Sequence, residues 1–256
     1  MKGRAGMFDF VPPYSATVVE RVLAAGAQLT DSMNEADAFL GTKAADYYIK
    51  PTYGTVSRFG VIARASSMDQ VGVSAHELDT AFHVLRLIAG HDANDGTSLP
   101  QEKYEYAPPV RELKITEFKY GAEAVEAVYM IISSAEFSGN ASRFDGIKFG
   151  RRHENYKNAD ELMINTRSAS FSPEMKLHAL MGAYVLSEGQ FERYYLKATK
   201  VRRIMKQLLE RDFESADAVR APDMTLAYLT GCPALITPDG ACYITREGQE
   251  GNFYGI

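Results

Sequence analysis

Basic residues are in the minority in this sequence. Its 28 Lys and Arg residues stand against 33 Asp and Glu residues, which gives a formal net charge of -5 and a pI near 5.6. A protein whose main partner is nucleic acid needs a basic face to hold the phosphates. We therefore expect no direct nucleic-acid partner.

Long apolar runs are absent as well. No stretch approaches the roughly 20 apolar residues that are needed to cross a bilayer. The start of the chain, Met1 to Phe10, carries charges and lacks the apolar centre of a signal peptide. We expect a protein that is neither secreted nor membrane-spanning and that works in the cytoplasm.

Cysteine is scarce, because the chain holds two residues of this type, Cys232 and Cys242. They flank the turn signal Pro238-Asp239-Gly240. If residues 234–237 pair with 241–245 around that turn, Cys242 lies opposite Ile236 and the two thiols do not face each other. Both thiols are predicted to be reduced. No Cys-x-x-Cys occurs and no His-Glu is followed by His one turn later, so we expect no metal site.

The common catalytic and nucleotide-binding motifs are missing too. The chain has no Gly-x-Ser-x-Gly, no Gly-x-Gly-x-x-Gly and no Gly-x-x-x-x-Gly-Lys, and we expect no cofactor. Ser66-Ser67 and Ser133-Ser134 look like nucleophile pairs, but a serine reacts only with a base held against it and with donors for the oxyanion. The sequence shows neither nearby. The histidines are expected at the surface or on helix flanks rather than as general bases: His76, His83, His91, His153 and His178.

The chain does have the composition and periodicity of a folded α/β protein. Hydrophobic residues make up 46% and charged residues 24%, which are ordinary globular values. A length of 256 residues suits one domain, predicted as 1–256. A helix at 15–26 followed by a short strand at 27–30 begins an alternation that is typical of the α/β class. The polar stretch 91–113 is predicted to be a long loop or a crossing between subdomains.

Further helices are predicted from the spacing of apolar residues. Ser74 and Glu77 form a capping box ahead of a helix that ends at Gly90. Another helix follows at 122–132. Ser172-Pro173-Glu174 begins a later one, whose buried stripe is predicted to comprise Leu177, Leu180, Met181 and Tyr184.

Several colinear segments of the chain are similar to those of one enzyme family. They include Phe10-Val11-Pro12-Pro13-Tyr14-Ser15, Asn34-Glu35-Ala36-Asp37-Ala38-Phe39, Lys50-Pro51-Thr52-Tyr53-Gly54, Ala65-Ser66-Ser67-Met68-Asp69-Gln70, Arg143-Phe144-Asp145-Gly146 and Lys200-Val201-Arg202. On these residues the chain resembles the amidase signature family, and more narrowly the A subunits of glutamine-dependent tRNA amidotransferases. The resemblance implies an α/β fold in which a mixed β-sheet is wrapped by helices. Residues 239–256 have no clear place in it.

The resemblance also implies a serine nucleophile, a second serine bonded to it and a lysine that drives proton transfer. In the family the lysine precedes the segment matched by Phe10, a region that we expect to be missing here. Both serines lie between the segments matched by Phe39 and Lys50. Here residues 40–49 read Leu-Gly-Thr-Lys-Ala-Ala-Asp-Tyr-Tyr-Ile and contain no serine. We therefore expect no catalytic residues of the amidase type and a pseudoenzyme that binds a ligand or forms a complex.

Two alternatives remain open. The chain could be an enzyme of altered chemistry that uses Cys232 or Asp145, or it could act on a glutamine-like amide together with a separate amidotransferase-type protein that supplies the missing loops. One ligand-binding residue is implied by the resemblance, because Arg202 matches an arginine that holds the glutamine carboxylate. The opposing interpretation of Arg202 is a salt bridge on a helix surface. Arg151 stands where the family often has a tyrosine.

A homodimer is the last expectation. Removal of the family's long serine-glycine region should expose apolar surface, and soluble monomers rarely expose large apolar patches. The segment Tyr47-Tyr48-Ile49 replaces that region and is predicted to supply contact area. A twofold dimer is the commonest way to cover such a patch.

Overall fold

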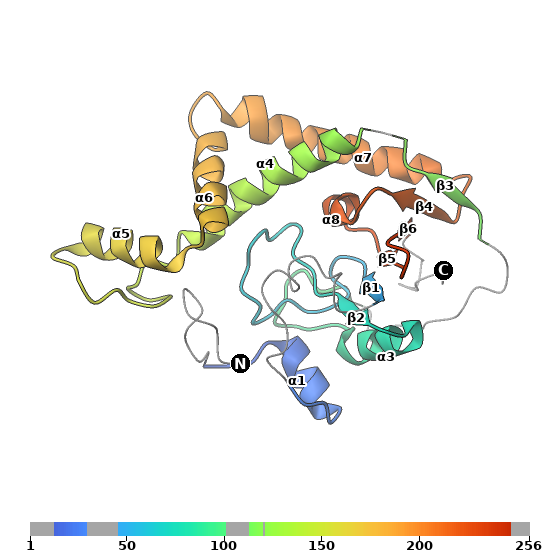
Figure 1. Cartoon of the computed structure of the whole chain (residues 1–256), viewed down its shortest axis with the longest axis horizontal. Helices are drawn as coiled ribbons and strands as arrows, with labels where there is room; N and C mark the ends of the chain where they lie inside the picture. Colours follow the sequence, from blue (N-terminus) through green and yellow to red (C-terminus); the bar gives the residue numbers. More distant parts are fainter. Residues whose placement is uncertain (1–12, 30–45, 101–112, 120, 247–256) are drawn as a thin grey trace. The chain divides into compact units, whose positions relative to one another are not determined.

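The computed structural model describes residues 13–29, 46–100, 113–119 and 121–246 (Figure 1). The matched segments at 10–12 and 34–39, Thr30 and most of the polar stretch after residue 100 lie outside these residues. The chain divides into two compact units. We call them the sheet unit, Ser15–Val61 with Met68–Glu126 and Val201–Ile256, and the helical unit, Met1–Tyr14 with Ile62–Ser67 and Ala127–Lys200. A single domain over the whole chain remains a prediction.

A mixed six-stranded sheet forms the centre of the sheet unit, in the order β2-β1-β5-β6-β4-β3. All neighbouring strands run antiparallel except β3 and β4, which run parallel. The predicted α/β class with a mixed sheet is therefore confirmed. The strands are β1 Tyr47–Lys50, β2 Val73–Ala75, β3 Ile115–Glu117, β4 Ala218–Ala221, β5 Ala234–Ile236 and β6 Cys242–Thr245.

The hairpin of β5 and β6 has the register that its sequence predicts. Ile236 pairs with Cys242, and Gly240 in the turn has a φ of 81°, a left-handed conformation that glycine adopts without strain. Both Cys232 and Cys242 are buried, and neither forms a disulfide.

Two helices cover the β1–β2 side of the sheet. Helix α3, Leu78–Ile88, contacts β1 and β2, and α1, Thr17–Ala24, contacts α3. Apolar residues recur every three to four positions along α3 because one face of the helix meets the sheet. That face buries four side chains that join Ile49 and Leu235 in one cluster: Ala81, Phe82, Leu85 and Ile88. A third helix, α8 Thr225–Thr230, immediately precedes the β5–β6 hairpin.

Two local predictions in this unit are wrong. Ser74 is not a helix cap, because it lies in β2 and pairs with Tyr48; the helix begins after Glu77, whose side chain makes no capping bond. Residues 27–29 are not in a strand, since they follow α1 as irregular backbone. For Ser74, pairing with the distant strand β1 outweighed the local capping pattern, whereas residues 27–29 are exposed and have no pairing strand among the described residues.

The helical unit is built from the long helix α4, Ala122–Ala141, which begins in the sheet unit, and from α5 Ala159–Ser170 and α6 Pro173–Val185. A short π-helix η1, Phe191–Leu196, leads into α7, Lys197–Asp212, which continues into the sheet unit. Ser172 caps α6 as predicted, because its side chain accepts a hydrogen bond from the Met175 backbone N–H.

The buried face of α6 differs from the predicted one. Leu177, Leu180 and Tyr184 are 53%, 70% and 52% exposed, whereas the buried residues are His178, Gly182 and Val185. The face that packs includes a histidine and a glycine, whereas three of the large apolar residues of the helix lie outside it. Apolar spacing alone therefore chose the wrong side.

Strand β1 lies inside the sheet, between β2 and β5. Ile49 is fully buried, and the Tyr48 hydroxyl lies 2.9 Å from the Tyr228 hydroxyl. Ile49 therefore cannot supply contact area for a second copy, which corrects that part of the expectation. Among the described residues, no helix combines the length and apolarity that a membrane span requires.

Candidate functional site

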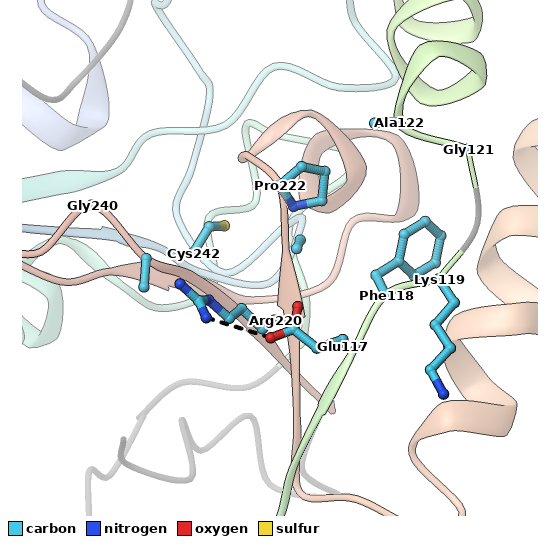
Figure 2. A pocket seen from close by; sticks show the side chains of 11 residues that line it. Glu117, Phe118, Lys119, Gly121, Ala122, Arg220, Pro222, Gly240 and Cys242 are labelled. Carbon is cyan, nitrogen blue, oxygen red and sulfur yellow. Dashed lines mark hydrogen bonds and ion pairs between the residues drawn. The ribbon is translucent and has the colours of Figure 1, made fainter.

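A cavity of about 390 Å³ lies at one end of the sheet. Because β3 and β4 are parallel, their carboxyl ends meet at the same edge, and β6 begins beside the end of β4, where Cys242 pairs with Ala221. Crevices outside the carboxyl ends of parallel strands are common ligand sites in α/β folds. Its lining includes Glu117, Phe118, Lys119, Arg220, Pro222 and Cys242 (Figure 2).

Opposite charges face each other in this cavity. Nη1 of Arg220 in β4 lies 3.4 Å from Oε1 of Glu117 in β3, with the two side chains 51% and 65% exposed. Arg220 also contributes to lowering the pKa of Asp239 in the hairpin turn, an effect due first to the hydrogen bond from Thr237. The positive charge of Arg220 therefore acts on two carboxylates, those of Glu117 and Asp239.

Lys119 lines the cavity but is not part of this pair. Figure 2 shows its ammonium pointing away from Arg220 and Glu117. Its charge acts on Asp212, whose pKa is raised by burial and lowered to a smaller extent by Lys119.

Cys242 is another lining residue, and its thiol is chemically quiet. Burial, with a further contribution from Asp223, raises its pKa to about 12 despite the opposing charge of Lys50. A thiol reacts as its thiolate, so Cys242 is not a nucleophile near neutral pH.

Lys50 is fully buried next to this thiol. Its ammonium donates hydrogen bonds to Oε1 of Gln70 at 2.6 Å and to the Pro51 carbonyl at 3.0 Å, and it lies 5.7 Å from the centroid of the Tyr228 ring. These contacts hold the cation in place inside the fold. Because the side chain has no exposed surface, it cannot reach a substrate in this arrangement.

Arg202, the residue implied by the resemblance, lies on α7 and is half-buried. Its Nε donates to the Leu229 carbonyl at 2.5 Å, which anchors the guanidinium near the end of α8. It does not line the described cavity. Arg151 is exposed in the segment between α4 and α5.

The residues considered for altered chemistry lie elsewhere. Cys232 is buried just after α8, and Oδ1 of Asp145 accepts the Ile147 backbone N–H at 2.8 Å, so this carboxylate closes a turn. Within the described part of the chain, no group of three or more His, Cys, Asp or Glu side chains is placed to hold a metal ion.

The serine pairs have structural partners in the helical unit. The Ser67 backbone N–H donates to Oε2 of Glu136, and Oγ of Ser66 accepts from Nδ2 of Asn140. Ser134 is fully buried, and its Oγ lies 2.9 Å from Nδ1 of His178.

This Ser134–His178 contact was not predicted, and the expectation that His178 lies at a surface or flank is wrong. The imidazole is 9% exposed, and Arg64 approaches its Nε2 at 3.3 Å. Burial first and then the Arg64 charge lower the pKa of His178, so the ring is neutral. Ser134 and Gly182 are small residues on α4 and α6, and their size permits the close packing of the two helices beside this histidine.

A family model described as Amidase matches residues 47–118 and 111–231. The A subunit of the glutamyl-tRNA(Gln) amidotransferase from Acinetobacter baumannii strain AYE is 34% identical over 261 residues, and the Nitrosomonas eutropha protein of the same name is 36% identical over 259. Each match covers 85% of this chain and 52% of the relative. The chain therefore spans about half the length of these curated relatives.

Solved structures agree at the level of the fold. A bacterial aryl acylamidase of the amidase signature family aligns with a TM-score of 0.56 and 12% identity, covering 78% of this chain and 55% of that one. The peptide amidase of Stenotrophomonas maltophilia aligns with a TM-score of 0.52 and 16% identity, covering 80% and 56%.

Proposed function

The chain belongs to the amidase family, and from that membership we propose that it is a non-hydrolytic member that acts by binding a ligand or a partner protein. One observation carries this proposal. The stretch between Phe39 and Lys50, where the family places both of its serines, contains no serine in this chain. Because that stretch is internal, the observation does not depend on where the chain begins.

The described side chains support the same conclusion. The buried cation Lys50 is engaged with Gln70 and Pro51, so it does not stand in for an exposed base. The buried thiol of Cys242 stays protonated, and Ser134 has no exposed surface next to His178. Covalent catalysis requires a nucleophile that a substrate can reach and a base that activates it.

A second candidate is a role in an amidotransferase. The curated relatives are named as subunits, so a separate protein that completes a site with this chain is a reasonable partner. In that case Arg202 is the residue that we propose for the carboxylate of a glutamine-like substrate, because a guanidinium offers parallel donors to a carboxylate.

The test is ammonia release from glutamine, asparagine and simple amides by the purified chain, followed with a coupled enzymatic assay. We expect no release above a blank without protein. Cys232→Ser and Asp145→Asn are the matched variants for altered chemistry. Release that scales with protein and is lost in either variant contradicts the proposal. Release that appears only when an amidotransferase-type partner is added supports the second candidate.

A further inference from the structure

We propose that the cavity at the end of β3 and β4 binds a free α-amino acid with an apolar side chain, its carboxylate on Arg220 and its ammonium on Glu117. This rests on the proposed function and deepens it, because it gives the binding role a site and a class of ligand. The residues that carry it come from neighbouring strands: Glu117 ends β3, and Arg220 lies one residue before the end of β4.

The ion pair is easily exchanged. Arg220 and Glu117 meet through one contact at 3.4 Å, and more than half of each side chain is exposed. Exposed pairs of this kind contribute little to stability because solvent screens them. A ligand that offers each charge a better partner can therefore separate the pair at small cost.

The surrounding charges favour a zwitterion over a simple anion or cation. A lone carboxylate on Arg220 would stand beside the carboxylate of Glu117 and within the influence of Asp239. A lone ammonium on Glu117 would face the guanidinium, and like charges at such distances repel. In an α-amino acid the ammonium and the carboxylate are attached to the same carbon atom. This short separation suits Glu117 and Arg220, which are paired neighbours on β3 and β4.

The remaining lining selects for the ligand's side chain. Phe118 and Pro222 also line the cavity and bring apolar side chains to it. Lys119 points away from the pair, so no cation is directed at an acidic ligand side chain (Figure 2). A volume of about 390 Å³ is within the size of small-molecule sites. Leucine is accordingly a suitable probe.

The experiment is calorimetric titration of the full chain with leucine, 4-methylpentanoate, 3-methylbutylamine and glutamate. The second and third probes lack the ammonium and the carboxylate of leucine, respectively. We expect binding of leucine at millimolar concentration or below, and affinities at least about tenfold weaker for the other three, since each loses or opposes a charge-assisted hydrogen bond. Equal binding of leucine and 4-methylpentanoate would overturn the assignment of Glu117.

Four variants locate the site. Arg220→Gln and Glu117→Gln should each weaken leucine binding about tenfold or more, while Arg203→Gln, at an exposed position of α7, should leave it unchanged. Arg202→Gln is the competing variant. If it abolishes binding and Arg220→Gln does not, the cavity is the wrong site. An absence of leucine binding overturns this inference but does not change the result of the ammonia-release assay. Ammonia release, in turn, refutes the non-hydrolytic role without affecting the leucine titration.

Discussion

Gly182 is the point at which α6 comes closest to α4. A Cβ built on Gly182 would lie 2.5 Å from the Cβ of Ser138 and 2.7 Å from the carbonyl carbon of Ser134, and closer still to the Ser134 carbonyl oxygen. Carbon atoms that are not bonded to each other pack best at about 3.5–4.0 Å, so both carbon–carbon distances are too short. Two of these neighbours are backbone atoms of α4, which cannot move aside as the end of a side chain can.

Replacement of Gly182 by alanine sets two effects against each other. Alanine is a better helix former than glycine by about 1 kcal/mol in a helix interior. Over-packing a tight contact costs about 1–3 kcal/mol, and a backbone neighbour places the cost at the upper end. We expect the clash to win, with a net loss of about 1–2 kcal/mol, or a fall in Tm of roughly 2–8 °C.

The matched control is Gly139→Ala. Gly139 also lies in a helix, near the end of α4, but it is exposed and an added Cβ meets nothing within 4 Å. Only helix propensity then changes, so this variant should be more stable by up to about 1 kcal/mol. Both variants are measured by urea unfolding followed by circular dichroism. If Gly182→Ala is as stable as the parent, or gains as much as Gly139→Ala, the close approach of α4 and α6 is refuted.

Two further predictions concern pH and self-association. Oδ2 of Asp92 accepts hydrogen bonds from Ser57 and Thr17, and these bonds lower the pKa of the carboxyl group from 3.8 to about 2. The ionised carboxylate therefore stabilises the fold above about pH 4, and this contribution is lost as the pH falls through 2. Asp92→Asn should cost about 1–2 kcal/mol at neutral pH, less than full conversion of the pKa shift because the amide oxygen can still accept hydrogen bonds. The deficit should shrink towards pH 2, and a constant deficit would contradict this. The exposed apolar residues of α6 lead us to expect a dimer by light scattering, weakened by Leu180→Glu, whereas a monomeric mass at every concentration would exclude it.

Local patterns predicted those parts of the fold that local interactions determine. The Pro-Asp-Gly turn fixes the register of the β5–β6 hairpin, because only a few residues separate the strands. The helix α3 follows from the spacing of Ala81, Phe82, Leu85 and Ile88, since one sheet face covers all four. In each case the interacting residues share one short segment.

The sequence did not predict the features that depend on distant partners. The cavity exists because β3 pairs with β4, which brings together Glu117 and Arg220 from positions 103 apart. The Ser134–His178 contact similarly needs α4 and α6 to approach at Gly182. The spacing of apolar residues in α6 predicted the wrong buried face. The helix approaches α4 through Gly182, and its largest apolar residues lie away from that contact. Such contacts require the tertiary arrangement, which a single sequence does not reveal.

The position of β1 inside the sheet has a consequence for the order of folding during synthesis. β1 pairs with β2 and β5, and Tyr48 meets Tyr228 across 180 positions of the chain. Until the ribosome has released β5, one edge of β1 has no strand to pair with, and Ile49 lacks its neighbour Leu235. Contacts of such long sequence separation slow folding, and unpaired strand edges in unfinished chains promote aggregation. The nascent chain therefore carries an open sheet edge from the synthesis of β1 until that of β5, which makes this strand the segment that a chaperone would have to shield.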